Sequence, residues 1–290
     1  MSLADVSAPL VVKFGGELLV ENGENGENGE NGDGGRASRL QIVTGAMARV
    51  AASRQPLVIV HGGGKEIDEA LKRAGIDKRQ VDGLRITDQS TLDVVVAVLG
   101  GTVNTRLVAA LVMAGTAAVG LTGADGGCGW AEAAAAHRSV DGRVVDLGRV
   151  GVPSEAADMR ILTTLIASGF VPVVACLGLG RDGRMLNVNA DTFAGHLAGR
   201  LGARRLVVAG TTAGVLDDQG ATVPQLDLPA IDRLIARRTA TAGMVAKLRA
   251  CQFALQSGVA DVVIVDGRNG STLEQAALGS WPASATRLVA

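Results

Sequence analysis

Aromatic side chains are scarce in this chain of 290 residues, which has two Trp, four Phe and no Tyr. A core with so few rings must be aliphatic, and the stacking platforms that bind single-stranded nucleic acid are missing. The formal net charge is −1, which leaves no basic excess to match a phosphate backbone. These two absences argue against nucleic acid as a partner.

Cysteine is also rare. Cys128, Cys176 and Cys251 are odd in number and widely spaced, which favours reduced core thiols over a disulfide framework or a zinc site. The histidines show no metal-ligand spacing either, so no resident metal is expected. We expect no apolar run of membrane-spanning length, and residues 1–9 lack a charged n-region followed by an apolar segment. The sequence therefore predicts a cytoplasmic protein without a membrane partner.

Two apolar segments each stop at glycines with a lysine close by. The first is LVVKFGG (residues 10–16), which contains Lys13, and the second is LVIVHGGGK (residues 57–65). A β-branched run that stops at glycines is typical of a buried parallel strand entering a tight turn. Glycine lets backbone N–H groups approach a ligand, and an ammonium in an apolar strand is costly unless an anion meets it. The pair predicts an anion-binding site; the alternative is a snorkelling lysine beside ordinary turns.

Strands alternate with helices along the chain, which indicates a mostly parallel sheet with helices on both faces. We predict an α/β fold, a three-layer αβα sandwich, with length enough for one large domain or two lobes. The expected strands are 10–14, 57–60, 117–121, 171–176, 205–209 and 261–265, with a hairpin at 131–146. The expected helices are 40–52, 65–74, 90–114, 154–168, 191–201, 228–238 and 244–257.

One segment does not fit this alternation. Residues 21–32 repeat Glu-Asn-Gly four times and contain nothing apolar to bury. We predict a disordered surface loop. The alternative, cation binding by its carboxylates, lacks a recognisable ligand spacing.

Two glycine motifs are misleading. Gly64-Lys65 lacks the first glycine and the Ser or Thr that a P-loop requires. GLGRDG (residues 178–183) matches a dinucleotide pattern, but the chain continues as an alternating strand instead of a helix, so a hairpin loop is predicted.

Three polar segments are better candidates for a site. NVNAD (residues 187–191) places two carboxamides and Asp191 at the mouth of a helix, although Asp191 would also serve as an N-cap. Lys247 falls in the first turns of a helix, where a bound anion would offset the unfavourable macrodipole; otherwise it is a solvated lysine. Arg85 in GLRITD (residues 83–88) suits a carboxylate ligand, or else a surface ion pair.

Taken in order, these segments resemble the amino-acid kinase family, and within it the members that phosphorylate acetylglutamate. The resemblance covers nearly the whole chain. Each segment is weak alone but the ordered set is specific, and GLRITD favours the acetylglutamate type over aspartate, uridylate or carbamate relatives. The matching segments are 13–16, 61–64, 83–88, 147–151, 187–191, 214–217 and 243–247.

The resemblance implies phosphoryl transfer from MgATP to the γ-carboxylate of N-acetyl-L-glutamate in arginine biosynthesis, with Mg²⁺ held mainly by the nucleotide. It implies an N-terminal lobe (1–178) for the acyl amino acid and dimerisation, and a C-terminal lobe (179–290) for ATP. A carboxylate nucleophile is already ionised at neutral pH, so no general base is required. The enzyme must bring two anions together and spread the transition-state charge.

Carried over by motif, Lys13 and Lys247 would flank the transferring phosphoryl group and Asp191 would hold both lysines. Arg85 would clamp the substrate α-carboxylate, and the paired glycines would donate backbone N–H groups. The implied substrate contacts are Gly62, Gly63, Arg85, Asn187 and Asn189. The implied phosphate and nucleotide contacts are Gly15, Gly16, Thr211, Gly214, Gly243 and Met244.

Two departures from the family pattern bear on these roles. Thr211 stands where relatives often carry an aspartate, which affects the expected ATP contact. The Glu-Asn-Gly repeat enters directly after the first glycine turn, as a lid or as a tolerated insertion. Only nine residues precede Leu10, fewer than the N-terminal helix that links arginine-inhibited relatives into hexamers. We therefore expect a homodimer that is insensitive to arginine and joined through residues 90–114.

Two alternatives stay open at this point. A kinase of the same family acting on N-acetylaminoadipate, free or carrier-linked, differs in substrate by one methylene, worth about 1–3 kcal/mol. A non-catalytic nucleotide or amino-acid sensor would fit the Thr211 departure, although it would not need Lys13, Asp191 and Lys247 together.

Overall fold

The computed structural model describes residues 7–19, 37–139, 142–236 and 242–290; the Glu-Asn-Gly repeat lies outside them. One eight-stranded sheet has the order β14-β16-β15-β13-β1-β2-β10-β5. Its pairs are parallel except for β15 with β16. The bounds are β1 Leu10–Phe14, β2 Leu57–His61, β5 Ala118–Thr122, β10 Val171–Ala175, β13 Arg205–Gly210, β14 Gln225–Asp227, β15 Val262–Asp266 and β16 Ala285–Val289.

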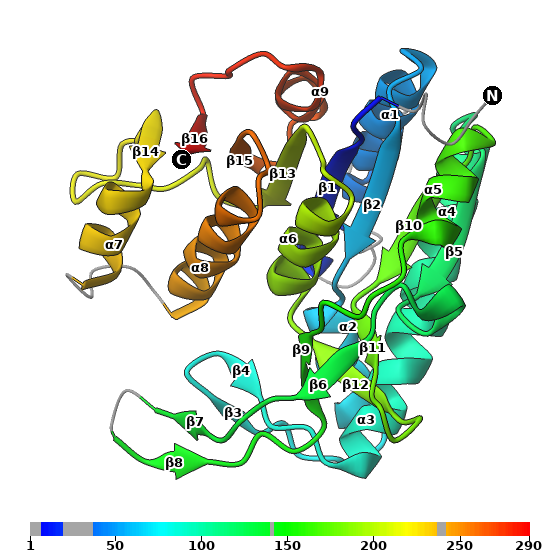
Figure 1. Cartoon of the computed structure of the whole chain (residues 1–290), viewed down its shortest axis with the longest axis vertical. Helices are drawn as coiled ribbons and strands as arrows, with labels where there is room; N and C mark the ends of the chain where they lie inside the picture. Colours follow the sequence, from blue (N-terminus) through cyan, green and yellow to red (C-terminus); the bar gives the residue numbers. More distant parts are fainter. Residues whose placement is uncertain (1–6, 20–36, 140–141, 237–241) are drawn as a thin grey trace, which may run out of the picture.

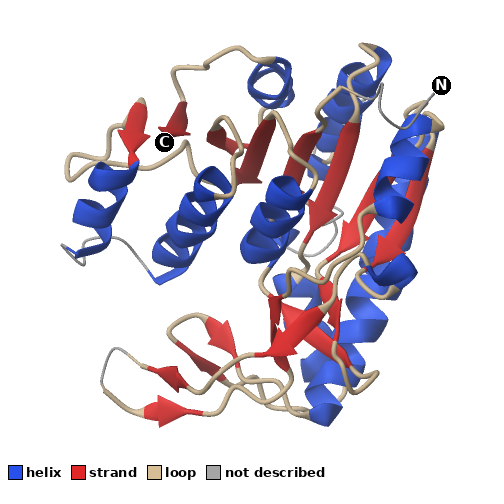
Figure 2. Cartoon of the chain, in the orientation of Figure 1, coloured by secondary structure: helices blue, strands red, loops and turns tan. Residues whose placement is uncertain are grey.

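Helices cover both faces of this sheet, so the predicted three-layer αβα architecture is confirmed (Figures 1 and 2). α6 and α8 pack together on one face, and α1 and α9 pack together on the other. The helices are α1 Arg39–Ala52, α2 Gly64–Arg73, α3 Gln89–Val96, α4 Asn104–Met113, α5 Arg160–Ala167, α6 Ala190–Arg200, α7 Leu228–Ala236, α8 Ala242–Gln256 and α9 Gly270–Leu278.

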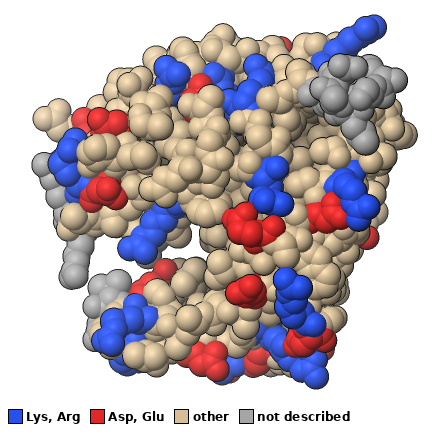
Figure 3. Space-filling model, in the orientation of Figure 1, with Lys and Arg blue, Asp and Glu red and all other residues tan. Residues whose placement is uncertain are grey.

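A second, smaller sheet lies beyond the carboxyl ends of the central strands. It has the order β11-β12-β9-β6, with bounds Leu177–Leu179, Met185–Val188, Val150–Pro153 and Ala131–Ala133. The antiparallel pairs β3 (Gln80–Val81) with β4 (Leu84–Arg85) and β7 (His137–Arg138) with β8 (Val144–Val145) lie beside it (Figure 1). The surface is hollowed between these strands and the lower ends of α7 and α8 (Figure 3).

The core is aliphatic, as the shortage of rings predicted. Every residue of β1 and β2 is buried, because a parallel strand in the middle of a sheet is covered on both faces. Phe14 and Phe193 are the largest fully buried side chains. The three cysteines are free and buried, and burial raises the pKa of each thiol to about 12.

Most predicted elements occur within one or two residues of their expected bounds, and the GLGRDG segment forms the predicted hairpin between β11 and β12. Three elements near the C-terminus were missed: β14, α9 and β16. The predicted 131–146 hairpin was wrong in part. β6 pairs with β9, so it takes no part in the hairpin. Within 131–146 only β7 and β8 pair with each other. Residues 140–141 of the turn between them lie outside the described residues.

The expected long helix at 90–114 is continuous over Gln89–Met113, with a π-helical segment at Ala97–Val103 between α3 and α4. By length and composition it would cross a membrane, so the expectation that no run reaches that length was wrong. Its inner side chains Leu99, Val103 and Leu107 belong to the hydrophobic core. A helix whose apolar face packs on a sheet can be as long and as apolar as one that crosses a membrane.

The predicted division at residues 178 and 179 falls inside β11. β1 from the first part pairs along its whole length with β13 from the second, so the eight-stranded sheet is continuous across the two parts. Any two-lobe motion therefore has to flex this sheet or move elements that lie outside it.

Candidate active site

The candidate site lies where β1, β2 and β13 end. The next strand, β2, pairs with one side of β1, and the later strand β13 pairs with its other side. The carboxyl end of β1 is thus a switch point, the place where open α/β sheets bind their ligands. Both predicted glycine turns lie there, because β1 and β2 pair in register from Leu10 with Leu57 to Phe14 with His61.

The two glycine turns are in direct contact. A Cβ on Gly16 would lie 2.9 Å from Gly63 Cα and 2.9 Å from Gly64 N, closer than real Cβ contacts allow. Only hydrogen at these positions lets the backbones approach so closely. The two turns therefore lie side by side, as the sequence predicts.

Gly16→Ala is expected to separate the turns and weaken nucleotide binding, because backbone, not a movable side chain, occupies the space of the new Cβ. Calorimetric titration with a non-hydrolysable ATP analogue measures the loss. Gly45→Ala in α1 is the matched control. Its Cβ would meet only the Arg49 side chain at 3.6 Å, so affinity should be unchanged and stability equal or slightly higher. Equal affinity of the Gly16→Ala variant and the wild type would show that the two glycine turns do not bind the nucleotide.

The backbone N–H groups of the two turns are not equivalent. Gly15 N donates to Ala209 O at 3.1 Å and Gly62 N donates to Phe14 O at 3.1 Å, within the sheet. The expectation that these two amides face a ligand was therefore wrong. Gly16 begins a 3₁₀ turn and Gly63 is the N-cap of α2, positions whose N–H groups have no intrahelical acceptor.

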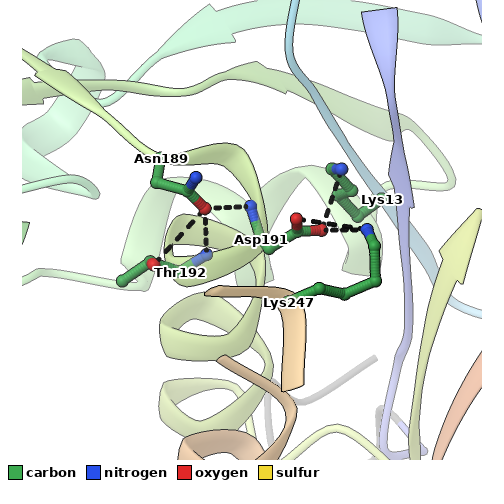
Figure 4. A network of polar contacts seen from close by, with 5 residues as sticks. All are labelled: Lys13, Asn189, Asp191, Thr192 and Lys247. Atoms are coloured by element: carbon green, nitrogen blue, oxygen red, sulfur yellow. Dashed lines mark hydrogen bonds and ion pairs between the residues drawn. The ribbon is translucent and has the colours of Figure 1, made fainter. Parts of the chain in front are cut away.

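Asp191 joins two lysines from different elements (Figure 4). Its Oδ1 lies 2.8 Å from Lys13 Nζ of β1, and Lys247 Nζ of α8 lies 3.1 Å from Oδ1 and 3.2 Å from Oδ2. The three side chains are 7%, 14% and 11% exposed for Lys13, Lys247 and Asp191, respectively. Asp191 thus contacts both lysines, and the roles predicted for these three side chains stay predictions.

The pKa values in this triad follow from burial and mutual charge. Burial opposes ionisation of Asp191, but Lys13 and Lys247 outweigh it and lower its pKa to about 2. Burial also opposes the charge of Lys13, but contact with Asp191 raises the pKa of that ammonium. Burial and the neighbouring Lys13 lower the pKa of Lys247. Two ammonium groups share one carboxylate, so the triad has spare positive charge for an anion.

Asn189, and not Asp191, is the N-cap of α6. Its Oδ1 accepts from Asp191 N at 3.0 Å and from Thr192 N at 3.1 Å (Figure 4). The cap fixes the first turn of the helix and so directs Asp191 toward the lysines. This resolves the capping alternative left open by the sequence: the cap and the lysine partner are different residues.

A cavity of about 420 Å³, here called the charged cavity, surrounds the triad. Eleven of the predicted site residues line this cavity. Its lining is Lys13, Gly15, Gly16, Glu17, Gly62, Gly63, Gly64, Asn189, Ala190, Asp191, Gly210, Thr211, Thr212, Gly243, Met244 and Lys247.

A second cavity of about 530 Å³, here called the apolar cavity, adjoins it, because Thr212 and Met244 line both. The predicted Gly214 lies here, together with the aliphatic side chains of Val215, Leu226 and Leu248. An apolar chamber that opens onto an anion site matches the two ends of a nucleotide.

Arg85 and Asn187 line neither cavity. Arg85 forms an ion pair with Asp68 and is 9% exposed, while its Nη1 is buried without a hydrogen-bond partner among the described residues. Arg85 Nη2 also lies 3.5 Å from the carbonyl of Gly64, a residue of the charged cavity. Asn187 Nδ2 donates to Thr87 Oγ1 at 3.2 Å.

Sequence reasoning missed five lining residues: Glu17, Gly64, Ala190, Gly210 and Thr212. All five adjoin predicted site residues in the chain, and adjacency would have pointed to each of them. Glu17 differs from the other four in its chemistry, since a carboxylate by itself does not suggest an anion site. Among the described residues, no group of three or more His, Cys, Asp or Glu side chains is placed to hold a metal ion.

Comparison with known proteins identifies the family of this chain. Residues 8–266 match the model of the amino acid kinase family. The chain belongs to that family. It is 44% identical over 215 residues to an acetylglutamate kinase of Acidiphilium cryptum, covering 73% of this chain and 72% of the relative. An acetylglutamate kinase of Granulibacter bethesdensis is 42% identical with the same coverage.

Solved structures share the fold of this family member. An N-acetylglutamate synthase from Neisseria gonorrhoeae superposes with a TM-score of 0.78 at 22% identity; the match covers 99% of this chain and 61% of the synthase chain. A carbamate kinase from Giardia lamblia superposes with a TM-score of 0.65 at 15% identity, covering 97% and 98% of the two chains. At these identities the likeness concerns the fold alone.

Proposed function

We propose that this chain phosphorylates the γ-carboxylate of N-acetyl-L-glutamate with ATP, in arginine biosynthesis. The observation that carries the proposal is the buried Lys13–Asp191–Lys247 triad beside two touching glycine turns, in a chain 44% identical to an acetylglutamate kinase. The spare positive charge suits a reaction in which a phosphate and a carboxylate approach each other.

In this proposal the apolar cavity holds the adenosine part of ATP, and the phosphates extend past Thr212 and Met244 into the charged cavity. Lys13 and Lys247 contact the transferring phosphoryl group, while Gly16 and Gly63 donate N–H groups. The C-terminal part of the chain (179–290) then binds ATP. Asp191 keeps both ammonium groups in position without approaching the phosphate itself. Thr211 contributes a hydroxyl to the same wall.

The acyl amino acid binds on the side of the N-terminal part (1–178), where Arg85 lies. The buried Arg85 Nη1 has no partner among the described residues, while Asp68 holds the other side of the guanidinium. A carboxylate is the ligand that such a half-satisfied guanidinium prefers. Asn187 and Asn189 are proposed to help orient the acetylamino group from β12 and the start of α6.

ADP release dependent on N-acetyl-L-glutamate tests the function. N-acetylaminoadipate and free glutamate are assayed beside it, and kcat/KM is compared for each. The proposal expects acetylglutamate to be the preferred substrate. A higher kcat/KM for acetylaminoadipate would assign the chain to that substrate, and nucleotide binding without turnover on any acyl amino acid would favour a sensor.

Arg85→Lys is expected to raise KM for acetylglutamate about 10-fold or more and to leave KM for ATP unchanged, because an ammonium cannot form the paired hydrogen bonds of a guanidinium. Steady-state kinetics with each substrate varied in turn measures both values. Arg79→Lys is the matched control, since Arg79 also pairs with an aspartate, Asp88, but is 53% exposed. Parallel rises in both KM values would point to a structural role for Arg85.

We also propose a cytoplasmic homodimer that is insensitive to arginine and joined through the segment 90–114. The outer end of this helix exposes Val112 and Met113, which are 51% and 87% accessible, and the neighbouring edge strand β5 is only half-buried. Light scattering gives the mass in solution, and a hexameric mass or strong inhibition by arginine would contradict the proposal.

A further inference from the structure

Glu17 is a carboxylate inside a cavity built for anions, and the proposed mechanism gives it no task. We propose that Glu17 is a protein ligand of the Mg²⁺ that accompanies ATP, directly or through a metal-bound water. The inference rests on the proposed function, because it assumes that a nucleotide triphosphate occupies the charged cavity.

Glu17 follows the first glycine turn immediately, within the 3₁₀ turn Gly16–Leu18, and lines the same cavity as both lysines. Its carboxylate lies against that turn: a Cβ on Gly15 would be only 2.7 Å from Glu17 Oε2. The side chain is half-buried, and it is close enough to Lys13 to help raise the pKa of that ammonium. Glu17 therefore belongs to the phosphate end of the cavity.

The two carboxylates of the charged cavity are in opposite situations. Asp191 Oδ1 contacts both lysines, and its Oδ2 contacts Lys247. Among the residues that the structure describes, none forms a hydrogen bond or an ion pair with the side chain of Glu17. Gly210, Thr211 and Thr212, which line the same cavity, carry no charge. Glu17 is thus the carboxylate available to a ligand.

An available carboxylate beside a triphosphate is unfavourable unless a cation separates them, because like charges in a partly desolvated cavity repel strongly. Mg²⁺ removes this conflict. It prefers oxygen ligands and is usually held by one or two carboxylates together with substrate phosphates and several waters. Glu17 with phosphate oxygens supplies that donor set without a preformed metal site of three or more side chains.

The inference predicts that one substitution changes nucleotide affinity in opposite directions with and without Mg²⁺. In Glu17→Gln, binding of the non-hydrolysable analogue AMP-PNP with Mg²⁺ should weaken about 10-fold, because a metal ligand is lost. Binding of AMP-PNP with EDTA present should instead become several-fold tighter, because a repelling charge is lost. Calorimetric titration under both conditions needs no turnover. Glu17→Asp, which keeps the charge on a shorter side chain, should retain tighter binding with Mg²⁺ than without it.

Glu132→Gln is the matched control, since Glu132 is exposed on β6 and lines neither cavity; both affinities should stay unchanged. If Glu17→Gln tightens binding under both conditions, Glu17 only repels the nucleotide, and the inference is wrong. If it weakens binding under both, its role is structural, and the inference is again wrong. Failure of the wild-type chain to bind AMP-PNP at all would overturn the proposed function as well, so the two failures are distinguishable.

Discussion

Lys13→Ala is expected to lower kcat by about 10²–10³, the effect of removing one preorganised contact to developing charge in a catalytic site. Lys13 is buried in the middle of the sheet, so water will not replace its ammonium at the same position. Lys247→Ala should act in the same direction. Initial rates of ADP release at saturating ATP and acetylglutamate measure both effects.

Lys72→Ala is the control for these variants, because Lys72 lies in the last turn of α2 and is exposed. The thermal midpoint of each variant separates lost catalysis from lost folding. Full activity of both Lys13→Ala and Lys247→Ala would overturn the assigned mechanism. A similar loss in the Lys72→Ala variant would show that the assay responds to general charge and not to the triad.

Asp191→Asn is expected to lower the free energy of unfolding by about 3–5 kcal/mol at neutral pH, because two buried ammonium groups lose their shared counter-charge. Activity should fall with it, since neither lysine is then held. Chemical denaturation monitored by circular dichroism measures the stability. Asp77→Asn on the surface is the matched control, and its stability should be within experimental error of the wild type.

Comparing the wild type with the Asp191→Asn variant also tests a prediction about pH. The pKa of Asp191 falls from 3.8 to about 2 on folding, so the ionised form is favoured in the folded state. Its contribution is complete above the unfolded pKa and is lost as the pH falls through the folded value. The stability difference between wild type and Asp191→Asn should therefore be constant near neutrality and shrink between about pH 4 and pH 2. A difference that does not change with pH in that range would show that Asp191 stabilises the fold by packing alone.

Much of the fold was predictable because its signals are local. Hydrophobic runs that end at glycines gave β1 and β2, and the buried strands of a parallel sheet leave an uninterrupted apolar pattern. β14 was missed because it has only three residues and lies at the edge of the sheet, where little apolar pattern is required. β16 and α9 are as long as elements that were predicted, so their length does not explain why they were missed. The hairpin at 131–146 was partly wrong because β6 finds its partner in the distant strand β9.

The sequence by itself determined which residues are candidates for an anion site: a lysine in an apolar strand, a second near a helix start, and glycines at two strand ends. Strand order decided the rest. Because β1 lies between β2 and β13, the two turns touch, and the Gly15 and Gly62 amides are consumed by the sheet. The packing of α6 against both α8 and β1 gives both lysines one carboxylate. Glu17, in the turn after β1, has no side-chain partner among the described residues. Local spacing sets turns and helix starts, whereas the pairing of charges distant in sequence depends on how the layers pack.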